Sequence, residues 1–87
     1  MAWVQYFVAV RDQGGEFVAS VPDLAGCECR AESGNEALGL IHHHIAAALS
    51  DLQNRGEPLP ESNSPLIHRR NPELANAVWH VLDVWLH

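Results

Sequence analysis

The first third of the chain has the hydrophobic pattern of a small β-sheet. Residues 3–10 (WVQYFVAV) and 16–21 (EFVASV) are rich in β-branched and aromatic side chains, which predicts two strands. Gly14 and Gly15 lie between them and predict a hairpin turn, because glycine adopts positive φ without steric cost. Residues 27–31 (CECRA) alternate apolar and polar side chains and predict a third strand.

The pattern becomes helical from about residue 35 to residue 54. Ser33 and Glu36 have the spacing of a capping box at the helix start, and Gly56 suits the left-handed position that follows a helix. One apolar stripe recurs at steps of three and four residues: Leu38, Ile41, Ile45, Leu49 and Leu52. These features predict one long amphipathic helix.

The last third combines a loop, a short helical turn and a final strand. Residues 56–65 (GEPLPESNSP) predict a loop, and Asn71 before Pro72 predicts the start of a helical turn. Residues 77–86 (AVWHVLDVWL) are apolar on both faces, which is typical of a strand in the middle of a sheet or under an oligomer contact.

The element order is therefore β-β-β-α-β, an α+β fold in one domain that spans residues 1–87. A helical crossover after three antiparallel strands predicts that the last strand returns beside the first and parallel to it. We therefore expect a small mixed sheet with one main helix on one face. The other face, with side chains such as Trp3, Phe7, Trp79 and Trp85 on one alternation, would need a partner, so we expect a homo-oligomer, a dimer or a tetramer.

The charge of the chain narrows the choice of partner. The 87 residues carry a net charge of −6, with five arginines and no lysine. Direct binding of nucleic acid, which relies on clustered cations, is not expected, whereas an acidic surface suits a basic protein. The sequence shows neither a signal peptide nor an apolar run of about 20 residues that would cross a membrane. Together with two cysteines that we expect to be free thiols, this predicts a cytoplasmic protein without membrane contact.

Two motifs resemble metal sites but lack the required geometry. Cys27 and Cys29 lie on one face of a strand, and no second ligand pair follows, so we interpret them as buried structural cysteines. His42, His43 and His44 are consecutive on a helix and splay by about 100° per residue, so they do not converge on one ion. A surface or partner contact is the preferred interpretation of the histidines. We predict no metal and no cofactor.

Four blocks, in order and over nearly the whole chain, resemble the signature of HicB-like antitoxins. Residues 14–18 (GGEFV) and 22–27 (PDLAGC) are similar to D-G-G-Y-x-V and P-D-L-P-G-C. Residues 33–38 (SGNEAL) are similar to T-x-x-E-A-L, and residues 56–61 (GEPLPE) to G-E-P-I-P-E. Residues 71–74 (NPEL) with 78–84 (VWHVLDV) are similar to N-P-E-Y-A…W-x-L-V-D-V-D.

The resemblance implies a partial ribonuclease-H-like fold without nuclease activity. It also implies a function, that of the antitoxin of a type II toxin–antitoxin pair. Such an antitoxin binds and occludes a HicA-type toxin, a small basic protein that cleaves mRNA with a histidine. Blocking a partner needs no catalytic residue, so we expect no enzyme activity.

The sequence departs from the family pattern at several places. Ala25 replaces a proline, Ala31 stands where a glycine often precedes the helix, and Trp85 replaces the second aspartate of D-V-D. Many relatives continue into a DNA-binding ribbon-helix-helix or helix-turn-helix segment, whereas this sequence ends at His87 after the last strand. We therefore expect a HicB-like domain that does not bind DNA directly.

The residues proposed to contact a basic toxin are acids around the hairpin and the corner that follows it. They are Asp12, Glu16, Asp23, Glu28 and Glu32. Two alternatives remain open at this point. One is a stand-alone oligomeric binding module with a different partner. The other is a degenerate metal-dependent nuclease using scattered carboxylates such as Asp12, Glu36 and Asp83.

Overall fold

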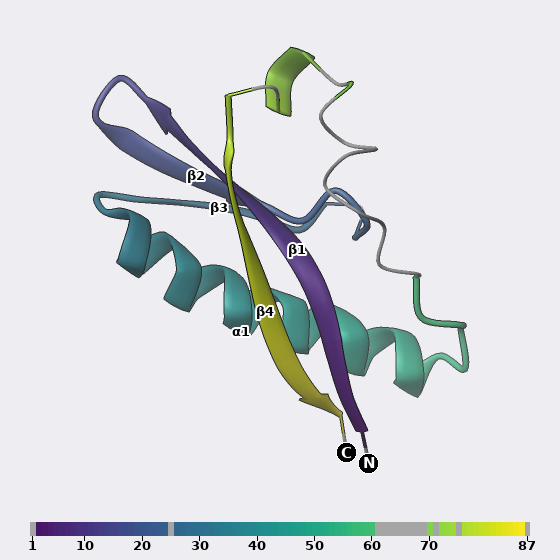
Figure 1. Cartoon of the computed structure of the whole chain (residues 1–87). Helices are drawn as coiled ribbons and strands as arrows, with labels where there is room; N and C mark the ends of the chain where they lie inside the picture. The colour runs from purple at the N-terminus through teal and green to yellow at the C-terminus, as the bar shows by residue number, and fades with distance from the viewer. Residues whose placement is uncertain (1, 25, 61–69, 71, 75, 87) are drawn as a thin grey trace.

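The computed structural model describes residues 2–24, 26–60, 70, 72–74 and 76–86, which pack around one hydrophobic core (Figure 1). The sheet has the strand order β3-β2-β1-β4, and α1 lies across one face of it. The elements are β1 (Ala2–Gln13), β2 (Glu16–Ser20), β3 (Glu28–Ala31), α1 (Gly34–Asn54), the 3₁₀ turn η1 (Pro72–Leu74) and β4 (Val78–Leu86).

The β1–β2 hairpin turns at the predicted glycine pair. Gly14 and Gly15 have φ values of 66° and 89°, in the region that a side chain would disfavour. The backbone N–H of Gly15 also donates a hydrogen bond to the Asp12 carboxylate at 3.2 Å. Asp12 therefore has a structural role in the turn.

Helix α1 begins and ends where the capping residues predict. The Glu36 backbone N–H donates to the Ser33 hydroxyl at 3.1 Å, which satisfies one of the free donors in the first turn. Gly56 follows the helix with a φ of 71°. Ile41, Ile45 and Leu49 are fully buried along the side that faces the sheet, and each contributes about 1.5–3 kcal/mol through burial.

The orientation of β4 differs from the prediction. β4 runs antiparallel to β1, with Val78 opposite Val10 and Leu86 opposite Ala2, so the prediction of a parallel return and a mixed sheet was wrong. A direct crossover through α1 would have given a parallel strand. α1, however, ends beside Leu24, at the end of the sheet away from the hairpin, whereas β4 begins at the hairpin end, with Val78 opposite Val10. The two chain ends consequently lie side by side (Figure 1).

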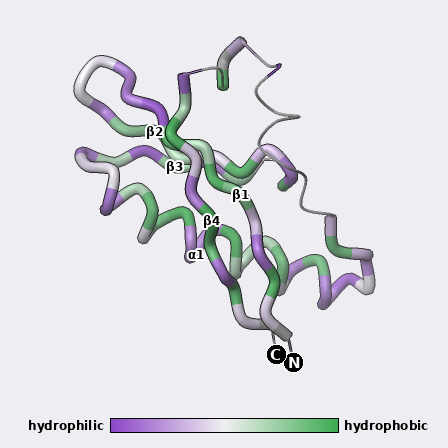
Figure 2. The backbone as a smooth tube through the Cα atoms, in the orientation of Figure 1, coloured by the Kyte–Doolittle hydropathy of each residue, from purple (hydrophilic) through white to green (hydrophobic). Residues whose placement is uncertain are grey.

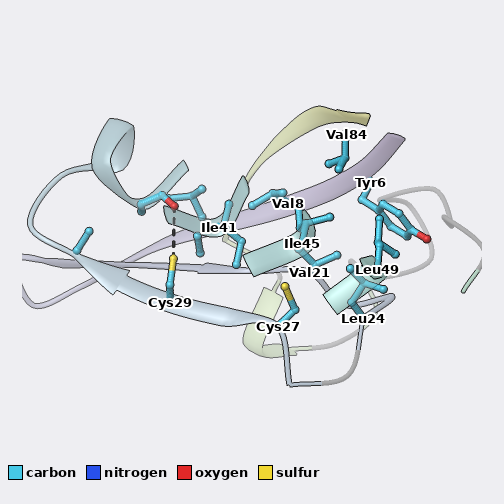
Figure 3. Close-up of a cluster of buried hydrophobic side chains, with 14 residues drawn as sticks. Tyr6, Val8, Val21, Leu24, Cys27, Cys29, Ile41, Ile45, Leu49 and Val84 are labelled. Carbon is cyan, nitrogen blue, oxygen red and sulfur yellow. Dashed lines mark hydrogen bonds between the residues drawn. The ribbon is translucent and has the colours of Figure 1, made fainter. Parts of the chain in front are cut away.

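The two faces of the sheet have different surroundings. Hydrophobic positions recur along β1 and β4 in Figure 2. Tyr6, Val8 and Val10 of β1 and Val84 of β4 belong to the core cluster that α1 covers (Figure 3). We call this side the helix face and the opposite side the outer face.

Among the residues that the structure describes, those that cover the outer face lie at its hairpin end. Pro72 and Asn76 line the same hollow as Arg11 and Arg30, which places η1 against the half of this face nearest the hairpin. Trp3 and Trp85, at the other end, are 65% and 39% exposed. β4 is an edge strand, not a central one, and the predicted uncovered face is confirmed for the half around these tryptophans.

Candidate partner-binding surfaces

Three of the five predicted acidic residues gather at the hairpin end of the sheet. Asp12 and Glu16 flank the turn, and the pairing of Phe17 with Ala31 places Glu32 beside Glu16. All three acids are exposed. We call them the hairpin acids. They lie at the tip of the β1–β2 hairpin, with Asp12 on the helix face, where it pairs with Phe17, and Glu16 on the outer face, where it pairs with Gln13.

The other two acids lie elsewhere. Glu28 is on the outer face, where one of its carboxylate oxygens lies 3.8 Å from the Arg11 guanidinium. Asp23 is half-buried at the corner after β2, near Tyr6. Burial raises the pKa of the Tyr6 hydroxyl, and the negative charge of Asp23 raises it further. The predicted set therefore does not form one continuous surface.

A second candidate surface lies at the opposite end of the sheet, where the outer face meets α1 along the β4 edge. It is a groove of about 790 Å³ lined by Trp3, Gln5, His42, Asp83 and Trp85. We call it the tryptophan groove. The rings of Trp3 and Trp85 meet edge to face, with centroids 5.1 Å apart and planes at 62°. They are direct partners in the β1–β4 ladder, as are Gln5 and Asp83.

Sequence patterns did not reveal the tryptophan groove. The antiparallel register of β1 and β4 creates it, and the predicted parallel return would have paired different residues. Trp85 departs from the family motif. Its adjacency to Trp3, however, depends on the register.

The three consecutive histidines have different neighbours. All three are exposed on α1. The His42 ring nitrogen Nε2 donates a hydrogen bond to the Asp83 backbone carbonyl at 3.0 Å, which connects the helix to the edge strand β4. His42 thus contacts another element of its own chain, a role that the sequence did not specify.

Cys27 and Cys29 are buried and free, as predicted (Figure 3). The Cys29 thiol donates to the Ala37 carbonyl at 3.4 Å. Burial raises the pKa of both thiols. They are packing residues between the sheet and α1, in thiol form at neutral pH.

The carboxylates considered for a nuclease are far apart. Asp12 is at the hairpin, whereas Asp83 lies opposite Gln5, about 23 Å away along β1 at 3.3 Å per residue. Among the described residues, no three His, Cys, Asp or Glu side chains are placed to hold a metal ion. No helix in this part of the chain is both long and apolar enough to cross a membrane.

Residues 6–87 match the family model described as the HicB-like antitoxin of bacterial toxin–antitoxin systems. The chain belongs to this family. UPF0150 protein Ta0767 of Thermoplasma acidophilum is 32% identical to this HicB-like chain over 57 residues, which are 66% of this chain and 83% of that protein.

Solved structures of HicB antitoxins resemble the HicB-like domain closely. The N-terminal domain of Burkholderia pseudomallei antitoxin HicB superimposes with a TM-score of 0.78 at 27% identity, over 95% of this chain and 100% of that one. The longer structure of the same antitoxin gives 0.77 at 25% identity, over 95% of this chain and 63% of that one, so this chain spans less than two thirds of its length. A chain of the HicA3–HicB3 toxin–antitoxin complex has the same fold, with a TM-score of 0.66 at 20% identity over 97% and 99% of the two chains.

Proposed function

We propose that this HicB-like chain binds a HicA-type mRNA-cleaving toxin and blocks it by occlusion. The observation that carries the proposal is the family match over residues 6–87. The likeness to an antitoxin N-terminal domain over the whole of that domain supports it further. Occlusion requires a stable complex and no chemistry, so the chain acts without catalysis.

The charge of the chain supports a basic partner. A net charge of −6 without lysine attracts a cationic protein over long range and raises the association rate. The toxin acts on mRNA, so we place the antitoxin in the cytoplasm with its target.

The hairpin acids share the hairpin end of the sheet, and we assign them to steering the toxin. Exposed rim charges affect association rates and salt dependence more than they affect dissociation. Replacing both Glu16 and Glu32 with lysine should therefore lower the association rate and reduce its salt dependence. Lysines at Asp51 and Glu57, two exposed acids at the far end of α1, make the matched control with the same change in charge.

Rate constants for the two double variants would be measured by surface-based binding kinetics at several salt concentrations. Equal association rates for the hairpin variant and the wild-type chain would remove the hairpin acids from the interface.

We also propose that the domain self-associates, as a dimer or a tetramer. The support is its small core together with the exposed apolar side chains of Val78 and Val81 on β4. Light scattering coupled to size-exclusion chromatography would measure the mass over a range of concentrations. A monomeric mass at all concentrations would refute this part of the proposal.

The direct test of partner choice is co-expression with the small basic protein encoded beside this chain. Affinity purification of this chain should recover that protein in a fixed ratio that survives gel filtration. Absence of a complex would contradict the proposed function.

A further inference from the structure

The tryptophan groove combines exposed aromatic surface with a carboxylate. Asp83 is exposed between the two β1–β4 pairs Trp3–Trp85 and Phe7–Val81. No described arginine lines this groove. Aromatic faces beside an anion form a cavity that suits a cation, because the ring quadrupole and the carboxylate both attract positive charge.

A second copy of this chain fits the groove poorly. In a twofold contact between two grooves the same patch of each copy would cover the other, and because no described arginine lines the groove, this contact would bury Asp83 without a guanidinium partner. Addition of a strand to the edge of β4 is also impeded, because His42 already donates to the Asp83 carbonyl on that edge. The carboxylate of Asp83 in the groove favours a partner that supplies a cationic side chain, and the occupied edge carbonyl disfavours one that only adds a strand.

We infer that the tryptophan groove is the anchor point for the toxin and accepts one of its arginine side chains. This inference rests on the proposed function. The guanidinium stacks against the exposed tryptophans, and its N–H groups reach the Asp83 carboxylate and the Gln5 amide oxygen. Arginine suits this groove better than lysine because its planar fork both stacks and forms paired hydrogen bonds. The hairpin acids then steer the toxin, and the groove holds it.

The test uses two variants of exposed positions. Trp3→Ala removes one aromatic face, and Asp83→Asn removes the charge while keeping the shape. The matched control is Asp51→Asn, which removes the same charge from an exposed site on α1. Circular dichroism of each variant confirms that the fold is retained.

Binding is measured against the neighbouring-gene toxin with its catalytic histidine replaced. Trp3→Ala should weaken binding by about five- to thirty-fold, the range for a cation held by aromatic rings in a desolvated site. Asp83→Asn should weaken it by about tenfold or more, because a hydrogen bond to a charged group is lost. The loss should appear mainly as faster dissociation. Asp51→Asn should bind like the wild-type chain.

The outcomes separate this inference from the proposed function. If the wild-type chain binds the toxin and both groove variants bind equally well, the inference fails and the proposed function stands. If the wild-type chain does not bind, both fail. If Trp3→Ala converts an oligomer to a monomer without changing toxin affinity, the groove is a self-association surface and the inference is overturned.

Discussion

Replacement of Ile45 by alanine tests how α1 is held on the sheet. Ile45 is fully buried in the middle of the helix stripe, between Ile41 and Leu49. Removing a buried isoleucine side chain to alanine costs about 2–5 kcal/mol, through lost transfer free energy and the cavity that remains. Because alanine favours helix slightly more than isoleucine does, we expect a net loss of about 3 kcal/mol.

That loss is a large share of the total stability of such a domain. An 87-residue domain has roughly 4–13 kcal/mol of unfolding free energy at 0.05–0.15 kcal/mol per residue. The melting temperature should fall by about 12–24 °C, at 4–8 °C per kcal/mol for a chain of this size. The assay is urea and thermal unfolding followed by far-ultraviolet circular dichroism at one fixed protein concentration.

Leu40→Ala is the matched control on the same helix. Leu40 is 38% exposed, so its truncation should cost less than about 1 kcal/mol. If Ile45→Ala cost under 1 kcal/mol, or no more than Leu40→Ala, the packing of α1 on the helix face would be refuted.

Two further predictions concern the ends and the interior of the fold. Ser33→Ala should lower the free energy of unfolding by about 1 kcal/mol because the Glu36 N–H loses its acceptor. Ser33→Asn, which keeps a side-chain acceptor, should retain most of the wild-type stability. The urea midpoints of the two variants measure this difference. Stability should also fall as the pH rises above about 9, because folding raises the pKa values of the Cys27, Cys29 and Tyr6 groups. Folding favours the neutral forms of these three groups. Their contribution to the free energy of unfolding is therefore complete at pH values below the pKa values of the unfolded chain, and it is lost as the pH rises through the higher pKa values of the folded chain. Urea titrations from pH 8 to 11 would measure this loss of stability. In a Tyr6→Phe variant the free energy of unfolding should fall less steeply above pH 10. An equally steep fall in the variant would contradict the assignment of this loss to the Tyr6 hydroxyl.

Local signals in the sequence predicted the individual elements well. The glycine pair, the capping residues around Ser33 and the 3.6-residue stripe each depend on neighbours close in the chain, so their structures follow from local rules. The family resemblance was likewise confirmed by the family match.

Long-range features were less predictable. The orientation of β4 depends on the path between Asn54 and Val78, which no local pattern encodes, and the standard crossover rule gave the wrong direction. The tryptophan groove follows from that orientation, because the antiparallel register brings Trp3 to Trp85 and Gln5 to Asp83. The five predicted acids are close in the sequence, whereas the sheet separates Glu28 and Asp23 from the hairpin acids.

Titration of the purified toxin with this chain in an mRNA-cleavage assay is the most direct test of antitoxin function. The small basic protein encoded beside the chain is supplied at a fixed concentration with an RNA substrate, and the antitoxin is added in steps. Occlusion predicts that cleavage falls linearly and stops at a fixed molar ratio. Cleavage that persists at a large excess of this chain would contradict the proposed function.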